Sequence, residues 1–177
     1  MDASISYGFL QIVSDEAIGH TGGLLLVDQD AKPTEFHCTA PVSENSTQKI
    51  LYGETWASHV FCDLIGAALV EKSSCMPELL FIGQPELIQL AGKVAPPVLM
   101  VKRDGGETAN QNHPAEFPEM LIDGLTVSVL SKDLVQFQFA KEACDRFTTS
   151  LTLDEPFERI RQAIGEAQQV ARQSDAA

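Results

Sequence analysis

The chain has 177 residues, 44% of them hydrophobic and 21% charged, which is typical of a soluble globular protein and excludes disorder and collagen-like repeats. Its 25 acidic and 12 basic residues give a net charge of −13, which repels phosphate backbones and anionic membranes. There is no apolar run near the ~20 residues of a membrane-spanning helix, and the start at Met1-Asp2 is unlike a signal peptide. We expect a cytoplasmic protein that binds neither nucleic acid nor membrane.

The four cysteines show no pairing pattern. They lie far apart, at Cys38, Cys62, Cys75 and Cys144, so none forms the Cys-x-x-Cys pair of a zinc or redox site. We expect reduced, mostly buried thiols, and we predict neither a bound metal nor a cofactor.

The first third of the chain is predicted to form a three-stranded antiparallel meander. Residues 7–13 and 23–27 are almost continuously apolar, as in central strands, and a turn-rich connection over 14–21 separates them. Residues 28–33 have the composition of a hairpin turn. Residues 34–40 then alternate between apolar and polar side chains, which indicates a strand with one buried face.

Helices and strands alternate in the middle of the chain. Apolar residues recur at helical spacing over 57–72, which predicts an amphipathic helix whose first turns are broken or bent at Gly53. Strands are expected over 78–83 and 96–101, with a short helix over 85–91 between them.

The last third begins with a long polar loop over 103–118, which is a lid, a linker or a disordered segment. A strand is expected over 125–130. Residues 131–150 fit either a strand or a helix, and we favour the helix. An amphipathic helix closes the chain up to residue 172, and residues 173–177 are expected to fray.

This order of elements predicts a single α/β domain over residues 1–172. The antiparallel meander is followed by strand–helix–strand units, which give a mixed sheet with helices packed on it. The order resembles the ribonuclease H-like fold, a mixed five-stranded sheet with helices on both faces. This resemblance is one of topology.

Three short segments resemble a family of bacterial proteins of unknown function. They are EFHCTAPV at 35–42, ILYG at 50–53 and EPFERI at 155–160. The resemblance implies no activity and no site residue.

A ribonuclease H-like nuclease needs carboxylates that hold one or two divalent metal ions. Such enzymes place these acids on the first strand, near the first long helix and at the end of the fourth strand. Here the first strand has no acid in its core, and Asp15 and Glu16 lie just beyond it. Glu86 is the nearest acid after the fourth strand. With Asp63 of the long helix, these are the residues that a metal-dependent hydrolase would use.

The long helix carries a histidine and a carboxylate side by side. His59 and Asp63 are four residues apart, about 40° around the helix from each other, so they can form a hydrogen-bonded pair. Cys62 lies about 60° from His59 and could act beside it as a nucleophile or metal ligand. We interpret the pair as a surface contact.

The C-terminal helix carries a narrow apolar stripe that spans barely two heptads. The stripe consists of Phe157, Ile160, Ile164, Ala167 and Ala171. It either docks on its own domain or forms a face for a protein partner or a second copy of the chain.

The sequence contains no convergent catalytic set; the only candidates are His59, Asp63, Asp15 and Glu86. We therefore predict a non-catalytic protein-interaction or regulatory module, with a homodimer as one of its forms. The alternative is a divalent-metal-dependent, nuclease-like hydrolase of ribonuclease H-like topology. A third hypothesis is a small-molecule binder with the loop 103–118 as its lid.

Overall fold

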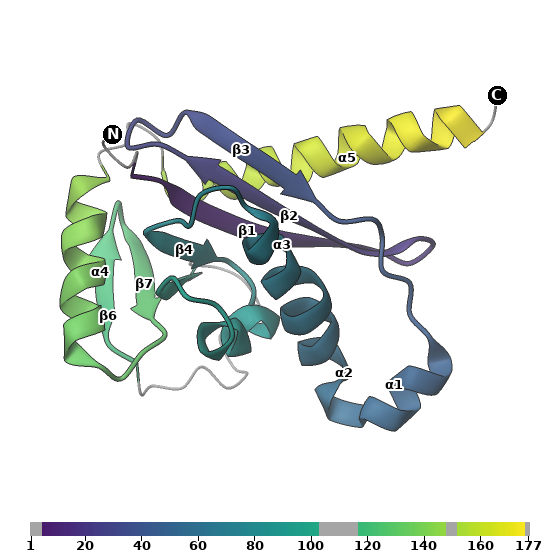
Figure 1. Ribbon diagram of the computed structural model, residues 1–177, viewed down its shortest axis with the longest axis horizontal. Coiled ribbons are helices and arrows are strands. Elements are labelled where there is room, and N and C mark those ends of the chain that lie inside the picture. The colour runs from purple at the N-terminus through teal and green to yellow at the C-terminus, as the bar shows by residue number, and fades with distance from the viewer. Residues whose placement is uncertain (1–4, 103–116, 148–151, 176–177) are drawn as a thin grey trace.

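A computed structural model describes residues 5–102, 117–147 and 152–175, so the predicted loop lies outside the described chain except for its last two residues. The described chain is built around a seven-stranded sheet in the order β3-β2-β1-β4-β5-β7-β6 (Figure 1). The strands are β1 (Tyr7–Asp15), β2 (Gly19–Val27), β3 (Pro33–Cys38), β4 (Leu79–Ile82), β5 (Val98–Lys102), β6 (Glu119–Ile122) and β7 (Leu125–Val129). β4 pairs in parallel with β1 and β5, and the other pairings are antiparallel. The predicted mixed α/β sheet is confirmed.

The helices occupy both faces of this sheet. They are α1 (Ser46–Tyr52), η1 (Gly53–Thr55), α2 (Trp56–Ser58), η2 (His59–Ala67), α3 (Ala68–Lys72), η3 (Pro85–Gly92), α4 (Leu134–Arg146) and α5 (Glu155–Asp175). No helix of the described chain is long and apolar enough to cross a membrane.

The alternation of side chains along β1 builds two hydrophobic cores. Tyr7 and Phe9 point to the face covered by α4 and α5. Leu10 and Ile12 point to the opposite face, which the helices between Trp56 and Val70 cover together with η3. All four β1 side chains are at most 2% exposed, so the sheet is the middle layer of three.

The β1–β2 hairpin projects beyond the parallel part of the sheet. β1 pairs with β2 along its whole length, from Tyr7 to Asp15, but with β4 only from Tyr7 to Leu10. The expected turn over 14–21 is shorter than predicted, since β1 ends at Asp15 and β2 begins at Gly19. The part of the hairpin beyond Leu10 therefore has no β4 neighbour, and its residues can form a site at the hairpin tip.

The three large side chains of the apolar stripe of α5 pack on the chain's own sheet, whereas Ala167 and Ala171 are exposed. Phe157, Ile160 and Ile164 are each 0% exposed and pack on the sheet. Gly23 of β2 permits this contact, because a Cβ atom there would lie 2.5 Å from Ile160 Cγ2. Figure 1 shows the other end of α5 extending beyond the sheet. The stripe is mainly a docking surface for the chain's own domain.

The long helix has a π-helical centre. η2 is a π-helix over His59–Ala67, flanked by the α-helical turns α2 and α3. A π-helix has more residues per turn than an α-helix, which shifts the faces of the residues that follow. Leu64, predicted on the apolar face, is 45% exposed, whereas Cys62 is fully buried.

Candidate functional site

The parallel pairing of β1 with β4 ends next to two glutamines, Gln11 and Gln84. Gln84, which follows β4, extends the pairing with its side chain: its Oε1 accepts a hydrogen bond from Ile12 N at 2.7 Å, and its Nε2 donates to Ile12 O at 3.1 Å. Both polar atoms of the amide are thus used to hold β1. A carboxylate could accept only the first of these two bonds.

Gln11 occupies the middle of β1, on the face covered by α5. Its side chain is 6% exposed, its Nε2 donates to Ile12 O at 3.2 Å, and its Oε1 has no hydrogen-bond partner among the described residues. A Cβ atom on Gly83 would lie 3.7 Å from this Oε1 and 3.8 Å from the ring of Phe157. The buried polar side chain in the middle of β1 is therefore a neutral amide and not an acid.

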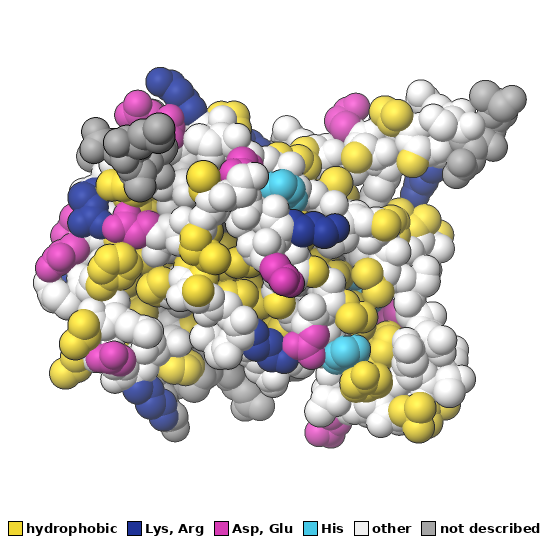
Figure 2. All heavy atoms as spheres, viewed as in Figure 1, with side chains coloured by type: hydrophobic (Ala, Val, Ile, Leu, Met, Phe, Trp, Pro, Cys, Tyr) yellow, Lys and Arg dark blue, Asp and Glu magenta, His cyan; other side chains and the backbone are white. Residues whose placement is uncertain are grey.

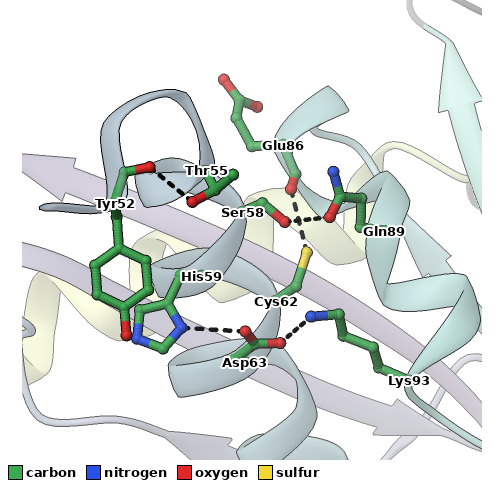
Figure 3. A network of polar contacts seen from close by, with 9 residues as sticks. All are labelled: Tyr52, Thr55, Ser58, His59, Cys62, Asp63, Glu86, Gln89 and Lys93. Atoms are coloured by element: carbon green, nitrogen blue, oxygen red, sulfur yellow. Dashed lines mark hydrogen bonds and ion pairs between the residues drawn. The ribbon is translucent and has the colours of Figure 1, made fainter. Parts of the chain in front are cut away.

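The predicted pair on the long helix forms, and it belongs to a network (Figure 3). His59 Nδ1 lies 3.1 Å from Asp63 Oδ2, Lys93 of the η3 end donates to the other carboxylate oxygen, and the ring of Tyr52 stacks on His59 at 4.3 Å. The contacts with Lys93 and then His59 lower the pKa of Asp63 below its usual value. The network links η2 to η3 at the surface.

Cys62 and Glu86 lie beside this network without joining its carboxylate. The thiol of Cys62 donates to the backbone oxygen of Glu86 at 3.2 Å, and burial raises its pKa. Figure 3 shows the carboxylate of Glu86 pointing away from Asp63. A buried thiol with a raised pKa is a poor nucleophile at neutral pH, so the geometry does not favour Cys62 as a catalytic residue.

Asp15 lies at the tip of the β1–β2 hairpin. Its Oδ1 accepts hydrogen bonds from the backbone of Ala17 at 2.8 Å and Ile18 at 3.2 Å, and its Oδ2 lies 3.6 Å from Arg172 of α5. The carboxylate thus shapes the turn.

The same tip borders a cavity of about 620 Å³. Asp15, Glu16, His20 and Glu44 line it together with Ser14 and Ser43. Ser14 Oγ lies 2.8 Å from His20 Nδ1, and Glu44 Oε1 lies 3.6 Å from His20 Nε2. Lys49 holds Glu44 at 2.9 Å and lowers the pKa of this carboxyl, with a smaller effect from His20. This cavity brings together more reactive groups than the other positions described above.

The carboxylates predicted for a metal-dependent hydrolase do not converge. Asp15 and Glu16 lie at the hairpin tip, whereas Asp63 and Glu86 lie at η2 and η3. Within residues 5–102, 117–147 and 152–175, no three His, Cys, Asp or Glu side chains are grouped so that they could hold a metal ion. The described residues do not fit a two-metal centre.

Ser14, His20 and Glu44 were not predicted from the sequence as site residues. Ser14 and His20 face each other across β1 and β2, and a backbone bridge from His20 to Val42 brings the following segment close. The register of the hairpin would have revealed the Ser14–His20 pair, but the predicted turn over 14–21 concealed it. No local pattern points to Glu44.

The basic side chains are mostly engaged by acids. Figure 2 shows Lys and Arg side chains scattered over the visible face without forming a stripe. The ion pairs among the described residues include Lys32–Asp30, Lys49–Glu44, Lys93–Asp63, Lys102–Glu119, Arg146–Glu78, Arg159–Glu155, Arg161–Glu158 and Arg172–Asp15. An anionic ligand would have to compete with these carboxylates.

Comparison with known proteins finds similarity at the level of structure. No family model matches the chain, and no curated protein matches it by sequence. The structure of human ENDOV matches 99% of this chain and 87% of its own, with a TM-score of 0.52 and 11% identity. The Ciona intestinalis Endonuclease V, in complex with a DNA that contains an inosine followed by a ribo-adenosine, matches 94% of this chain and 87% of its own, with a TM-score of 0.57 and 9% identity.

These matches correct two predictions. The solved structures that share the fold are nucleases, so a non-catalytic protein-interaction module is wrong as the main interpretation, and the nuclease-like alternative is better supported. The exclusion of nucleic acid is wrong too, since the Ciona intestinalis enzyme is bound to DNA in two of these structures. The fold that the order of elements suggested is confirmed: the chain has a ribonuclease H-like fold.

Proposed function

We propose that this protein is a nuclease-like hydrolase that acts on nucleic acid. The observation that carries the proposal is the ribonuclease H-like fold, matched over 99% of the chain by human ENDOV and over 94% by the Ciona intestinalis enzyme. In the Ciona complexes this fold holds DNA that contains an inosine. Inosine-containing strands are therefore the first substrates to try.

The cavity at the hairpin tip is our candidate for the reaction site. It lies beyond the carboxyl end of β1, and open α/β sheets commonly bind ligands outside the carboxyl ends of their strands. His20 can take a proton from an attacking hydroxyl and return it to a leaving group. The carboxylates of Asp15 and Glu16 could orient water or a substrate hydroxyl.

The proposal involves no metal-dependent step. The fold commonly binds divalent metals with acids on the first and fourth strands, whereas here the buried polar side chain of β1 is Gln11 and the side chain that follows β4 is Gln84, both neutral amides. We therefore expect cleavage to persist after chelation. His59, Asp63 and Glu86 stay predictions.

Binding of nucleic acid is expected to be weak and to depend little on salt. The steep salt dependence of nucleic-acid binding comes from the counterions that each Lys or Arg contact releases. The net charge is −13, and most cations of the described chain have acidic partners. Contacts through hydrogen bonds and stacking would have to provide most of the affinity.

The test is a cleavage assay with end-labelled single- and double-stranded DNA, RNA and inosine-containing DNA, at low salt, with EDTA or with Mg²⁺ or Mn²⁺. We expect cleavage of at least one of these in EDTA, reduced about 100-fold or more by His20→Ala, since a general base contributes about 10²–10⁴. Asp30→Asn is the matched control, because Asp30 is an exposed turn acid paired only loosely with Lys32, at 3.7 Å. Absence of cleavage on every substrate would refute the proposal, and cleavage only with metal would refute the metal-free site.

We also propose a cytoplasmic location. All four cysteines are free in the structure: Cys62 and Cys144 are buried, and Cys38 and Cys75 are exposed. Exposed free thiols are more typical of a reducing compartment.

A further inference from the structure

Ser14 and His20 form a pair in the cavity wall. They face each other in the β1–β2 register, so their side chains leave the hairpin on the same side. Ser14 Oγ lies 2.8 Å from His20 Nδ1, which is within hydrogen-bond distance. When Nδ1 carries no proton, Ser14 donates to it, as a serine nucleophile does to its base.

Contacts on three sides fix the position of the histidine. Its backbone exchanges two hydrogen bonds with Val42, at 2.9 and 2.8 Å, and its ring meets Phe61 of η2 edge-on at 5.0 Å. Gly19, which precedes it, has φ of +100°, and a Cβ atom there would lie 2.2 Å from Val42 O. The close approach of this segment thus depends on a glycine.

A carboxylate faces the other ring nitrogen. Glu44 Oε1 lies 3.6 Å from His20 Nε2, and Lys49 binds the second oxygen of Glu44 at 2.9 Å. A carboxylate in this place favours the imidazolium that forms when the histidine takes a proton. The order serine–histidine–carboxylate is that of a serine hydrolase. Here the serine contacts Nδ1 of the histidine, whereas in those enzymes it contacts Nε2.

We propose that Ser14 is a nucleophile, activated by His20 and Glu44, that attacks esters with no net negative charge. The charge of the cavity determines the class of ester. Its walls carry three carboxylates, those of Asp15, Glu16 and Glu44. Two cations pair with them: Arg172 with Asp15 and Lys49 with Glu44. An anionic ester binds there more weakly than a neutral one, as we already expect of nucleic acid. This inference uses the cavity proposed above for nucleic acid, but it does not depend on any action on nucleic acid.

The reaction needs no reagent besides water. Ser14 Oγ bonds to the carbonyl carbon while its proton passes to His20 Nδ1, and the alcohol of the ester leaves with that proton. Water then gives a proton to the same nitrogen and attacks the acyl group, and the proton returns to Ser14 Oγ as the acid leaves.

A fluorophosphonate probe tests the nucleophile directly. Reaction forms a bond from Oγ to phosphorus, breaks the phosphorus–fluorine bond and releases fluoride, while His20 takes the proton. We expect the full-length protein to gain one probe, located on Ser14 by peptide mass spectrometry, and Ser14→Ala to gain none. Ser58→Ala is the matched control, because Ser58 donates to Gln89, at 2.6 Å, and not to a histidine.

Two further variants separate activation from structure. His20→Gln keeps a polar side chain but removes the base, so labelling is expected to slow about 100-fold or more. Glu44→Gln is expected to slow it about fivefold, as for an exposed ion pair, with unchanged melting temperature. Glu35→Gln, which changes a similar acid 2.9 Å from His37, controls for loss of charge.

The outcomes are distinct from those of the cleavage assay. Failure of the wild-type protein to label, or equal labelling of Ser14→Ala, overturns the inference, whatever the protein does to nucleic acid. Labelling of Ser14 with hydrolysis of p-nitrophenyl acetate that Ser14→Ala loses supports it, even if no nucleic acid is cleaved.

Discussion

Removing the ring of Phe157 should destabilise the whole domain. Phe157 is 0% exposed and meets the ring of Phe9 edge-on, with centroids 5.4 Å apart. Truncation of a buried phenylalanine to alanine costs about 3–5 kcal/mol of unfolding free energy. In a domain of this size each kcal/mol lowers the melting temperature by about 2–4 °C, so Phe157→Ala should lower it by roughly 6–20 °C. That loss is a large part of the 5–15 kcal/mol typical of a whole domain.

Urea unfolding measures this loss, and a residue on the same helix controls it. Val170 is 61% exposed on α5, so Val170→Ala should change the unfolding free energy by no more than about 0.5 kcal/mol. Phe157→Ala should lower the urea midpoint with the same denaturant dependence. A loss below about 1 kcal/mol would refute the docking of α5 on its own sheet. An unfolding midpoint that rises with protein concentration would instead support a partner-facing stripe.

Three other predictions follow from backbone geometry and from pKa shifts. Gly19→Ala should lower the thermal stability by about 1–3 kcal/mol because of its positive φ, whereas Gly165→Ala, with open space around its Cβ, should raise it by up to about 1 kcal/mol. In an NMR titration the carboxyl of Asp63 should have a pKa below its usual value, and Lys93→Met should raise this pKa. The stability that the charged carboxylate contributes is lost as the pH falls through the lowered pKa. Cys144, whose pKa burial raises to about 12, should resist iodoacetamide at pH 8 while the folded protein's exposed cysteines react.

Much of the fold could be predicted because its signals are local. The meander follows from alternating and continuous apolar runs, and the N-terminal cap of α1 is Asn45, whose side chain accepts from two backbone N–H groups. The segment 131–150, ambiguous by its pattern, contains the helix α4, begun by an Asp133 cap. Capping residues and periodicity are properties of neighbouring residues, so sequence alone indicates them.

The sequence does not reveal the features that depend on distant contacts. β6 was not predicted, since it is an edge strand with few buried residues and lies next to the expected loop. The π-helix in η2 was missed because apolar spacing within the segment predicts only a helix, and its packing with Leu87 and Leu90 of η3 in one core joins segments apart in the chain. The cavity needed the hairpin register and the approach of Glu44 to His20, both of which join segments apart in the chain.

Gln11 of β1 and Gln84 after β4 bear on where the proposed reaction site lies. A carboxylate at position 11 would meet no donor among the described residues, because Gln11 Oε1 has no hydrogen-bond partner and Nε2 faces Ile12 O, and an unpaired buried charge costs several kcal/mol or is neutralised by a proton. A carboxylate at position 84 would lose the bond that Nε2 gives to Ile12 O. Neutral amides avoid both costs and keep the strands paired. Groups that must change charge during a reaction are better placed where water reaches them, and the proposed site at the tip of the β1–β2 hairpin meets this condition.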